Sequence, residues 1–157
     1  MATETASGAG EPGDRPRVSG YDQLRTAREA VEEALLSPTG DTVTWQATMT
    51  TGLRTLEGAF RRHREVSEAP GGTLDEAVKR LPELARAARG QRLEHGDILE
   101  EIDALLAKLA GKEDTGPADP EAIRWHVGRL QESIRRHLAK GGDFLYEAFV
   151  REEGGEG

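Results

Sequence analysis

The sequence lacks cysteine, has few aromatic residues and contains no long hydrophobic run, and each of these absences removes a class of protein. Without cysteine the chain forms no disulfide, no thiolate metal site and no cysteine nucleophile. Aromatic residues make up 4% of the chain, so its core must consist mainly of Leu, Ala, Ile and Val, residues that suit helices. No apolar run is long enough to span a bilayer, and the N-terminal residues lack the apolar segment of a signal peptide. We therefore expect a cytoplasmic protein with no membrane partner.

Basic residues are also in short supply. The 157 residues contain 21 Lys and Arg against 29 Asp and Glu, which gives a formal net charge of −8. Binding to nucleic acid requires a basic face for the phosphates, so we expect no nucleic-acid partner. The length suits a single domain with a real hydrophobic core.

Apolar residues recur at helical spacing in four long segments. These segments are 19–36, 42–68, 82–110 and 120–149. A short helical segment, 73–80, precedes Pro82, because proline interrupts a helix. The last segment follows Asp119, a good capping residue, and has Pro120 at its first position. The pattern predicts an all-α protein in which residues 19–150 form an antiparallel up-down-up-down four-helix bundle.

The two ends of the chain differ from the bundle in composition. Residues 1–18 are rich in Gly, Pro, Thr and charge, and they predict a disordered N-terminal tail. Residues 151–157 predict a flexible, acidic, glycine-rich tail.

Three of the four histidines lie on the apolar stripes of these helices. They are His63, His95 and His137, whereas His126 falls nearer the rim of its stripe. The interior of a helical bundle is where metal sites are built from His and Glu on facing helices. An inward histidine is equally compatible with a core residue that hydrogen-bonds a neighbour, and Gln91 is a candidate partner for His95. Both interpretations stay open at this point.

The helix register tests whether the three histidines meet. If segments 82–110 and 120–149 form a hairpin, His95 and His137 come to the same height. His63 lies near the end of its helix, and the mismatch with His95 is on the order of 10 Å at 1.5 Å per residue. We therefore predict one His95–His137 pair and a separate His63 site close to Tyr146 and Glu147.

Three carboxylates are candidate metal ligands because of their positions relative to these histidines. Glu94 and Glu147 flank the apolar stripes, and Asp143 points further out. A kink at Gly141-Gly142 would swing Asp143 and Glu147 towards the interior. Hard oxygen ligands of this kind are needed to bridge two iron ions.

Three segments of the chain carry a family resemblance. They are HREVSE at 63–68, LEH at 93–95 and RHLAKGGDFLYEAF at 136–149. With these segments the region from about 42 to 150 resembles the hemerythrin-like (HHE cation-binding) helical bundles. The resemblance implies a four-helix bundle around a di-iron centre that binds or senses oxygen or handles iron and peroxide.

The resemblance also implies roles for individual residues. His63 and Glu68 match the His/Glu pair of the second helix, and His95 matches a third-helix histidine. His137, with Asp143 or Glu147, matches the His/carboxylate pair of the last helix. The chain departs from the family pattern in its first helix, which has no histidine, and at positions 99 and 141, which are Leu and Gly.

Two main functional hypotheses follow. In the first, a hemerythrin-like bundle binds non-haem di-iron or a single divalent metal through His63, His95 and His137, with Glu94, Asp143 and Glu147 assisting. In the second, a metal-free bundle with core histidines is an interaction or dimerisation module whose exposed helix faces contact a protein partner or a second copy.

A third hypothesis is a small ligand bound in the polar core around Gln91, His95 and His137. The sequence has no phosphate-binding glycine loop, and its serines have no spaced His and acid partners that indicate a nucleophile. We therefore assign no catalytic residues.

Overall fold

The structure of the protein, a computed structural model, describes residues 16–112 and 118–151. Its elements are α1 (Pro16–Leu36), α2 (Thr42–Glu68), α3 (Thr73–Arg80), the 3-10 turn η1 (Pro82–Leu84), α4 (Ala85–Leu109) and α5 (Pro120–Phe149). Every element of the described part of the chain is helical, which confirms the all-α prediction for that part. Most of the two predicted tails, 1–15 and 152–157, lies outside the described residues. Residues 16–18 belong to α1 rather than to the tail, because Pro16 suits the first position of a helix.

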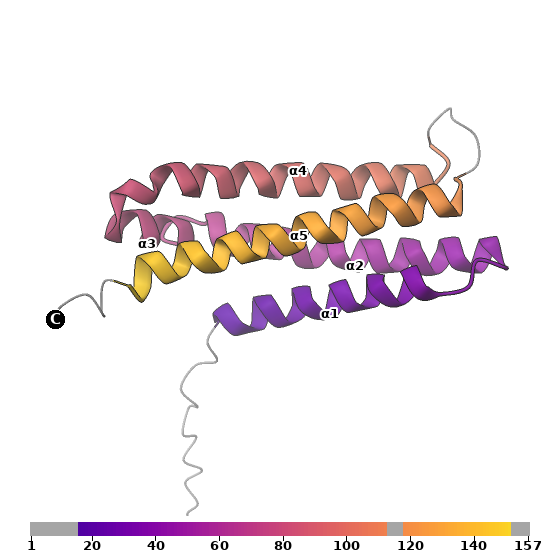
Figure 1. Cartoon of the computed structure of the whole chain (residues 1–157), viewed down its shortest axis with the longest axis horizontal. Helices are drawn as coiled ribbons and strands as arrows, with labels where there is room; N and C mark the ends of the chain where they lie inside the picture. Colours follow the sequence, from indigo (N-terminus) through magenta and orange to yellow (C-terminus); the bar gives the residue numbers. More distant parts are fainter. Residues whose placement is uncertain (1–15, 113–117, 152–157) are drawn as a thin grey trace, which may run out of the picture.

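The four long helices lie side by side (Figure 1). The connection from α1 to α2 lies at one end of the bundle, and α3 lies at the other end between α2 and α4. The end of α4 and the start of α5 lie at the first end. Within the ranges just given, no helix combines the length and the apolar character needed to cross a membrane.

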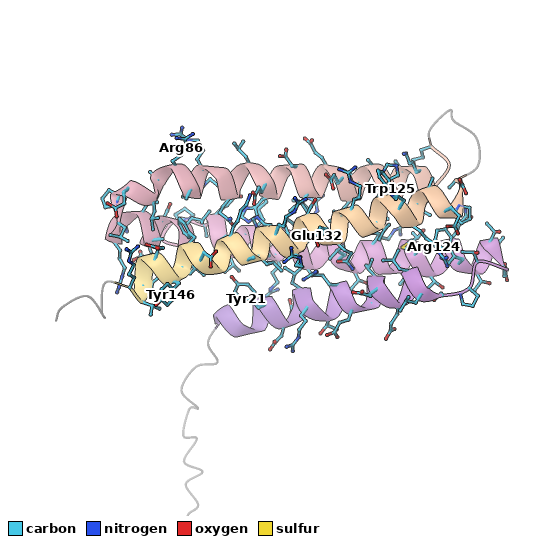
Figure 2. The ribbon with its side chains drawn as sticks, in the orientation of Figure 1. Tyr21, Arg86, Arg124, Trp125, Glu132 and Tyr146 are labelled. Carbon is cyan, nitrogen blue, oxygen red and sulfur yellow. The ribbon has the colours of Figure 1, made fainter. Side chains whose placement is uncertain are left out.

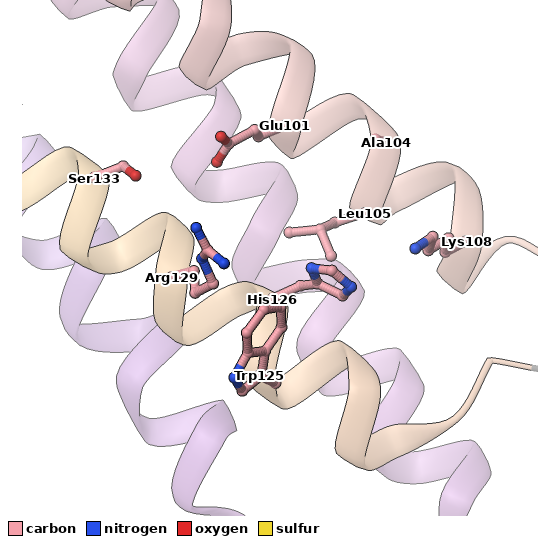
Figure 3. Close-up of a pocket in the computed structure, with 8 residues that line it drawn as sticks. All are labelled: Glu101, Ala104, Leu105, Lys108, Trp125, His126, Arg129 and Ser133. Carbon is pink, nitrogen blue, oxygen red and sulfur yellow. The ribbon is translucent and has the colours of Figure 1, made fainter.

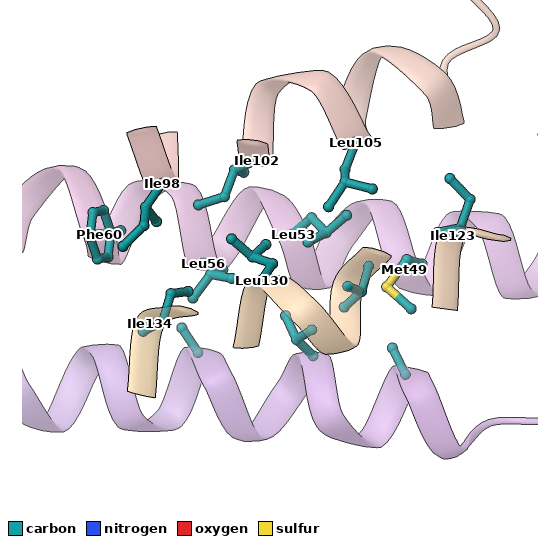
Figure 4. Packing of buried hydrophobic residues seen from close by; sticks show 14 of the residues in the cluster. Met49, Leu53, Leu56, Phe60, Ile98, Ile102, Leu105, Ile123, Leu130 and Ile134 are labelled. Carbon is teal, nitrogen blue, oxygen red and sulfur yellow. The ribbon is translucent and has the colours of Figure 1, made fainter. Parts of the chain in front are cut away.

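The main core consists of buried apolar side chains from all four long helices (Figure 4). Its members are Leu24, Ala27, Val31, Ala34, Trp45, Met49, Leu53, Leu56, Phe60, Ile98, Leu99, Ile102, Leu105, Ile123, Val127, Leu130 and Ile134. They follow the periodic stripes seen in the sequence, and burying a side chain of Leu or Ile size stabilises the fold by roughly 1.5–3 kcal/mol. This core holds the middle and one end of the bundle.

Local chemistry fixes where the helices begin and end. The Asp41 carboxylate accepts hydrogen bonds from the backbone N–H groups of Val43 and Thr44, at 3.1 and 3.2 Å, and caps α2. The Asp119 carboxylate accepts from the N–H of Glu121 at 3.2 Å and caps α5, with Pro120 in its first position as predicted. These short-range signals explain why the predicted helix bounds agree closely with the structure.

Helix α3 packs as a wedge beyond the end of α2. A second buried cluster joins it to α4 and α5, and its members are Leu74, Ala77, Ala88, Phe144 and Ala148. Because α3 occupies this space, α4 starts further along the bundle than α2 ends (Figure 1). This offset changes the relative heights of residues on α2 and α4, and it matters for the histidines described below.

Gly72, in the turn between α2 and α3, has no room for a side chain. A Cβ at this position would lie 2.6 Å from the carbonyl oxygen of Val66 and 2.8 Å from that of Ala69. Both neighbours are backbone atoms, so the turn itself would have to move.

We expect Gly72→Ala to lower the free energy of unfolding by about 1–3 kcal/mol, measured by denaturant titration. Gly58, where nothing lies within 4 Å of the added Cβ, is the matched control. Gly58→Ala should raise the free energy of unfolding by about 0.5–1 kcal/mol, since alanine is the better helix former. Equal effects of the two substitutions would contradict this account of the turn.

Candidate metal centre

Three histidines from three different helices meet inside the bundle. His63 comes from α2, His95 from α4 and His137 from α5, and one ring nitrogen of each lies within 4.8 Å of the others. His95 and His137 are almost fully buried and His63 is partly buried. The ring centroids are 4.7 Å apart for His95 and His137, 5.1 Å for His63 and His95, and 5.5 Å for His63 and His137.

The predicted pairing of His95 with His137 is therefore confirmed, whereas the prediction of a separate His63 site is wrong. The predicted mismatch of about 10 Å assumed that α2 and α4 share a common end. Instead α4 extends past the end of α2 and covers α3. That overhang brings His95 to the height of His63, and the His63 ring contacts the other two rings rather than the end of α5.

The spacing of the nitrogens fits a small metal ion. The Nε2 atoms of His63 and His137 are 3.3 Å apart, which is also a hydrogen-bonding distance. Two imidazole nitrogens bound about 2.05 Å from one ion at a tetrahedral angle lie about 3.3 Å from each other. One nitrogen from each of the three rings lies within 4.8 Å of those of the other two.

A carboxylate fixes the orientation of the His137 ring. Glu94 Oε2 lies 2.6 Å from His137 Nδ1, and Glu94 Oε1 accepts from the Lys140 ammonium at 2.6 Å. Burial raises the pKa of Glu94, but the hydrogen bonds from Lys140 and His137 outweigh burial and hold that pKa below its ordinary value. Because an ionised carboxylate only accepts, His137 Nδ1 carries the proton. In the neutral ring the lone pair is then on Nε2, which faces His63.

His95 is the least satisfied polar group of the cluster. Neither of its ring nitrogens has a hydrogen-bond partner among the described residues, although the side chain is fully buried. The nearest acid is Glu68, whose Oε1 lies 3.6 Å from His95 Nδ1 while its Oε2 accepts from Arg64 Nε at 2.8 Å. The predicted hydrogen bond from Gln91 to His95 is therefore not formed. Buried polar atoms without partners are uncommon and call for an explanation such as an ion.

The environment keeps two of the rings uncharged. Burial, together with the neighbouring rings of His95 and His137, lowers the pKa of His63 to about 3. Burial also lowers the pKa of His95 to about 4, aided by His137 and Arg64 and opposed by Glu68. Both imidazoles are therefore neutral near pH 7, which is the protonation state that binds metals.

Two aromatic side chains surround the cluster. The Phe60 ring is completely buried, and its centroid lies 5.5 to 5.9 Å from all three histidine rings. Tyr21, on α1, lies edge-on to His63 at 6.0 Å and is 41% exposed. Phe60 thus closes the cluster on the core side, and Tyr21 stands at the partly open side next to His63.

The remaining predicted ligands lie away from the three rings. Asp143 is exposed, and Glu147 forms an ion pair with Arg151 at 2.8 Å. Helix α5 runs through Gly141 and Gly142 without interruption, so the expected inward swing of the two acids does not occur. His126, predicted near the rim, is exposed.

Two further side chains contact the cluster. Glu68, which the family resemblance pairs with His63, is instead the acid nearest to His95. Tyr21, which the sequence did not indicate, contacts His63 because α1 packs against α2 at this point.

Protein-family models, curated proteins and solved structures yielded no match to this chain.

Proposed function

We propose that the protein is a hemerythrin-like, antiparallel four-helix bundle that binds one transition-metal ion through His63, His95 and His137. The observation that carries the proposal is His95, a fully buried imidazole beside two more imidazoles, whose two nitrogens have no hydrogen-bond partner among the described residues. The connections between helices, which alternate between the two ends of the bundle, support the antiparallel topology. The resemblance of segments 63–68 and 136–149 to hemerythrin-like proteins supports iron as the ion and oxygen or iron binding or sensing as its use.

The donor set supports a single ion rather than a pair. Two bridged iron ions need carboxylates between them. Here Glu94 contacts the Nδ1 atom of His137, on the side of the ring away from His63, and the Glu68 carboxylate is shared between Arg64 and His95. Neutral imidazoles suit zinc, copper, iron and nickel, so the nitrogen set alone does not choose among them.

Each residue of the cluster has a defined task in this proposal. The three imidazoles supply nitrogen lone pairs, and Glu94 holds the His137 ring in the tautomer that leaves Nε2 free. Phe60 excludes water from the core side. An ion held by the three imidazoles would supply Lewis-acid or redox chemistry. The half-exposed Tyr21 places the open side next to His63.

Metal titration tests the proposal directly. Protein stripped with a chelator is titrated with Co²⁺, Zn²⁺ and, without oxygen, Fe²⁺. We expect one ion per chain with a Kd below about 10 μM, and visible ligand-field bands for Co²⁺. If a folded, metal-free protein binds none of the three ions at this level, the histidines are core residues. The interaction-module hypothesis then takes the place of the metal site.

Removing the negative charge of Glu94 should weaken metal binding without removing a ligand. In Glu94→Gln the amide no longer stabilises the His137 Nδ1 proton as a carboxylate does, and Lys140 loses its partner. Loss of such a supporting carboxylate weakens metal affinity by about 10–100-fold. Competition with a chromophoric chelator measures the change, and Glu100→Gln, an exposed position on the same helix, is the control. An unchanged affinity in Glu94→Gln would remove this residue from the site.

A further inference from the structure

A pocket lies between α4 and α5, away from the histidine cluster. Its volume is about 350 Å³, and it is lined by side chains from both helices, including Leu105, Lys108, Trp125, His126 and Arg129 (Figure 3). This volume is at the lower end of the range for small-molecule sites, which suits a ligand of one or two rings.

The pocket gathers positive charge on an acidic protein. The Lys108 ammonium and the Arg129 guanidinium both line it, and neither forms an ion pair with any carboxylate among the described residues. In contrast, most arginines of the bundle that do form ion pairs, such as Arg61 and Arg64, pair with a glutamate one helical turn away. His126 adds a third hydrogen-bonding group to the same pocket. These side chains would attract one anionic group of a ligand, although the net charge of the chain is −8.

The aromatic part of the pocket is already ordered. Trp125 is 59% exposed, which is unusual for the largest apolar side chain. The Arg129 guanidinium lies over its ring at 4.9 Å, and the His126 ring stands edge-on to it at 5.0 Å. A guanidinium held on an indole face is a preformed partner for a carboxylate, and the pocket provides Leu105 and the indole for the ring of a ligand. The Glu101 carboxylate lies on the Arg129 side of the pocket, and Lys108 lies beyond Leu105 and His126 (Figure 3), so the pocket disfavours a second negative charge on the ligand.

We propose that this pocket binds a small aromatic monocarboxylate, with its carboxylate at Arg129 and its ring against Trp125 and Leu105. The site is built from residues that the histidine cluster does not use. Its occupation is therefore independent of whether the protein binds a metal.

Calorimetric titration with two matched probes tests this site. 2-Naphthoate carries the carboxylate, and 2-naphthamide has the same rings without the charge. We expect the naphthoate to bind at least about tenfold more tightly than the amide, because the Arg129 guanidinium attracts only the charged group. Arg129→Gln and Trp125→Ala should each weaken naphthoate binding by about tenfold or more, and Lys108→Gln by a smaller factor.

The controls separate this site from general attraction to basic residues. Arg86→Gln, an exposed position on α4 outside the pocket (Figure 2), should leave naphthoate affinity unchanged. Far-UV circular dichroism checks that each variant is folded. The proposal is overturned if the naphthoate does not bind at a concentration of about 1 mM, at which a fragment-sized ligand should bind. It is also overturned if the naphthoate binds no better than the amide, or equally well to Arg129→Gln and wild type.

Discussion

Replacing His95 with leucine should stabilise the metal-free protein while removing its metal binding. In the wild type both ring nitrogens of His95 are buried with no partner in the described part of the chain, and an unsatisfied buried polar group costs about 1–3 kcal/mol. Leucine has a similar volume and no polar atom, so it should fill the space among Phe60 and its neighbours without that cost. We expect the free energy of unfolding of metal-free His95→Leu to exceed that of the wild type by about 1–3 kcal/mol.

In the presence of metal the same substitution should have the opposite effect on stability relative to the wild type. A structural zinc site of four ligands contributes about 10–16 kcal/mol, so losing one ligand should weaken binding by about two to three orders of magnitude. Saturating metal at 100 times Kd raises the stability of the wild type by about 2.7 kcal/mol, and the same concentration should not stabilise His95→Leu. Chemical unfolding with and without the ion measures both effects. A marked loss of stability in metal-free His95→Leu would instead identify His95 as an ordinary packing residue. His126→Leu, at an exposed position, is the control for a lost histidine.

Acid should destabilise the metal-free protein well above the pH at which carboxylates titrate. The folded-state pKa is about 3 for His63 and about 4 for His95, against an ordinary value of 6.5. Below pH 6.5 the unfolded chain therefore binds protons that the folded chain does not. Stability contributed by these two groups is fully present above pH 6.5 and is lost as the pH falls towards 3–4.

The size of this effect makes it measurable. At pH 5 each of the two histidines costs about 2 kcal/mol, so together they lower the free energy of unfolding by about 4 kcal/mol relative to pH 7. Denaturant titrations of chelator-treated protein between pH 7 and pH 5 measure how the free energy of unfolding changes with pH. His63→Gln should remove about half of this change, and His126→Gln, outside the cluster, should leave it intact. A stability that is flat over this range would show that His63 and His95 are not desolvated as the geometry requires.

Much of the fold follows from short-range signals in the sequence. The bounds of α2 and α3 agree with the predicted segments, because Asp41 caps α2 and the glycines after Pro70 end it. The interruption at Pro82 is present as η1. These features depend on a few neighbouring residues, so a pattern along the chain is enough to predict them.

The candidate site was only partly predictable for a physical reason. His95 and His137 lie on consecutive long helices joined by a short connection, so their register follows from counting residues. His63 reaches them across α3, whose packing against Phe144 and Ala148 sets how far α4 overhangs α2. That packing involves residues far apart in sequence, and no local pattern reports it. Asp143 was misjudged for a similar reason, because the paired glycines before it are accommodated in a straight helix.

Helix α1 contributes no imidazole, and its buried face consists of small or medium apolar residues such as Ala27, Val31 and Ala34. Its polar tie to the rest of the bundle is the reciprocal contact of Arg28 with Gln131, where the Gln131 amide donates to the Arg28 carbonyl at 2.9 Å. The proposed ligands thus come from three helices, while the fourth acts as a cover with Tyr21 at its edge. Substitutions on the buried face of α1 would therefore change access to the proposed site without changing any of the three histidines.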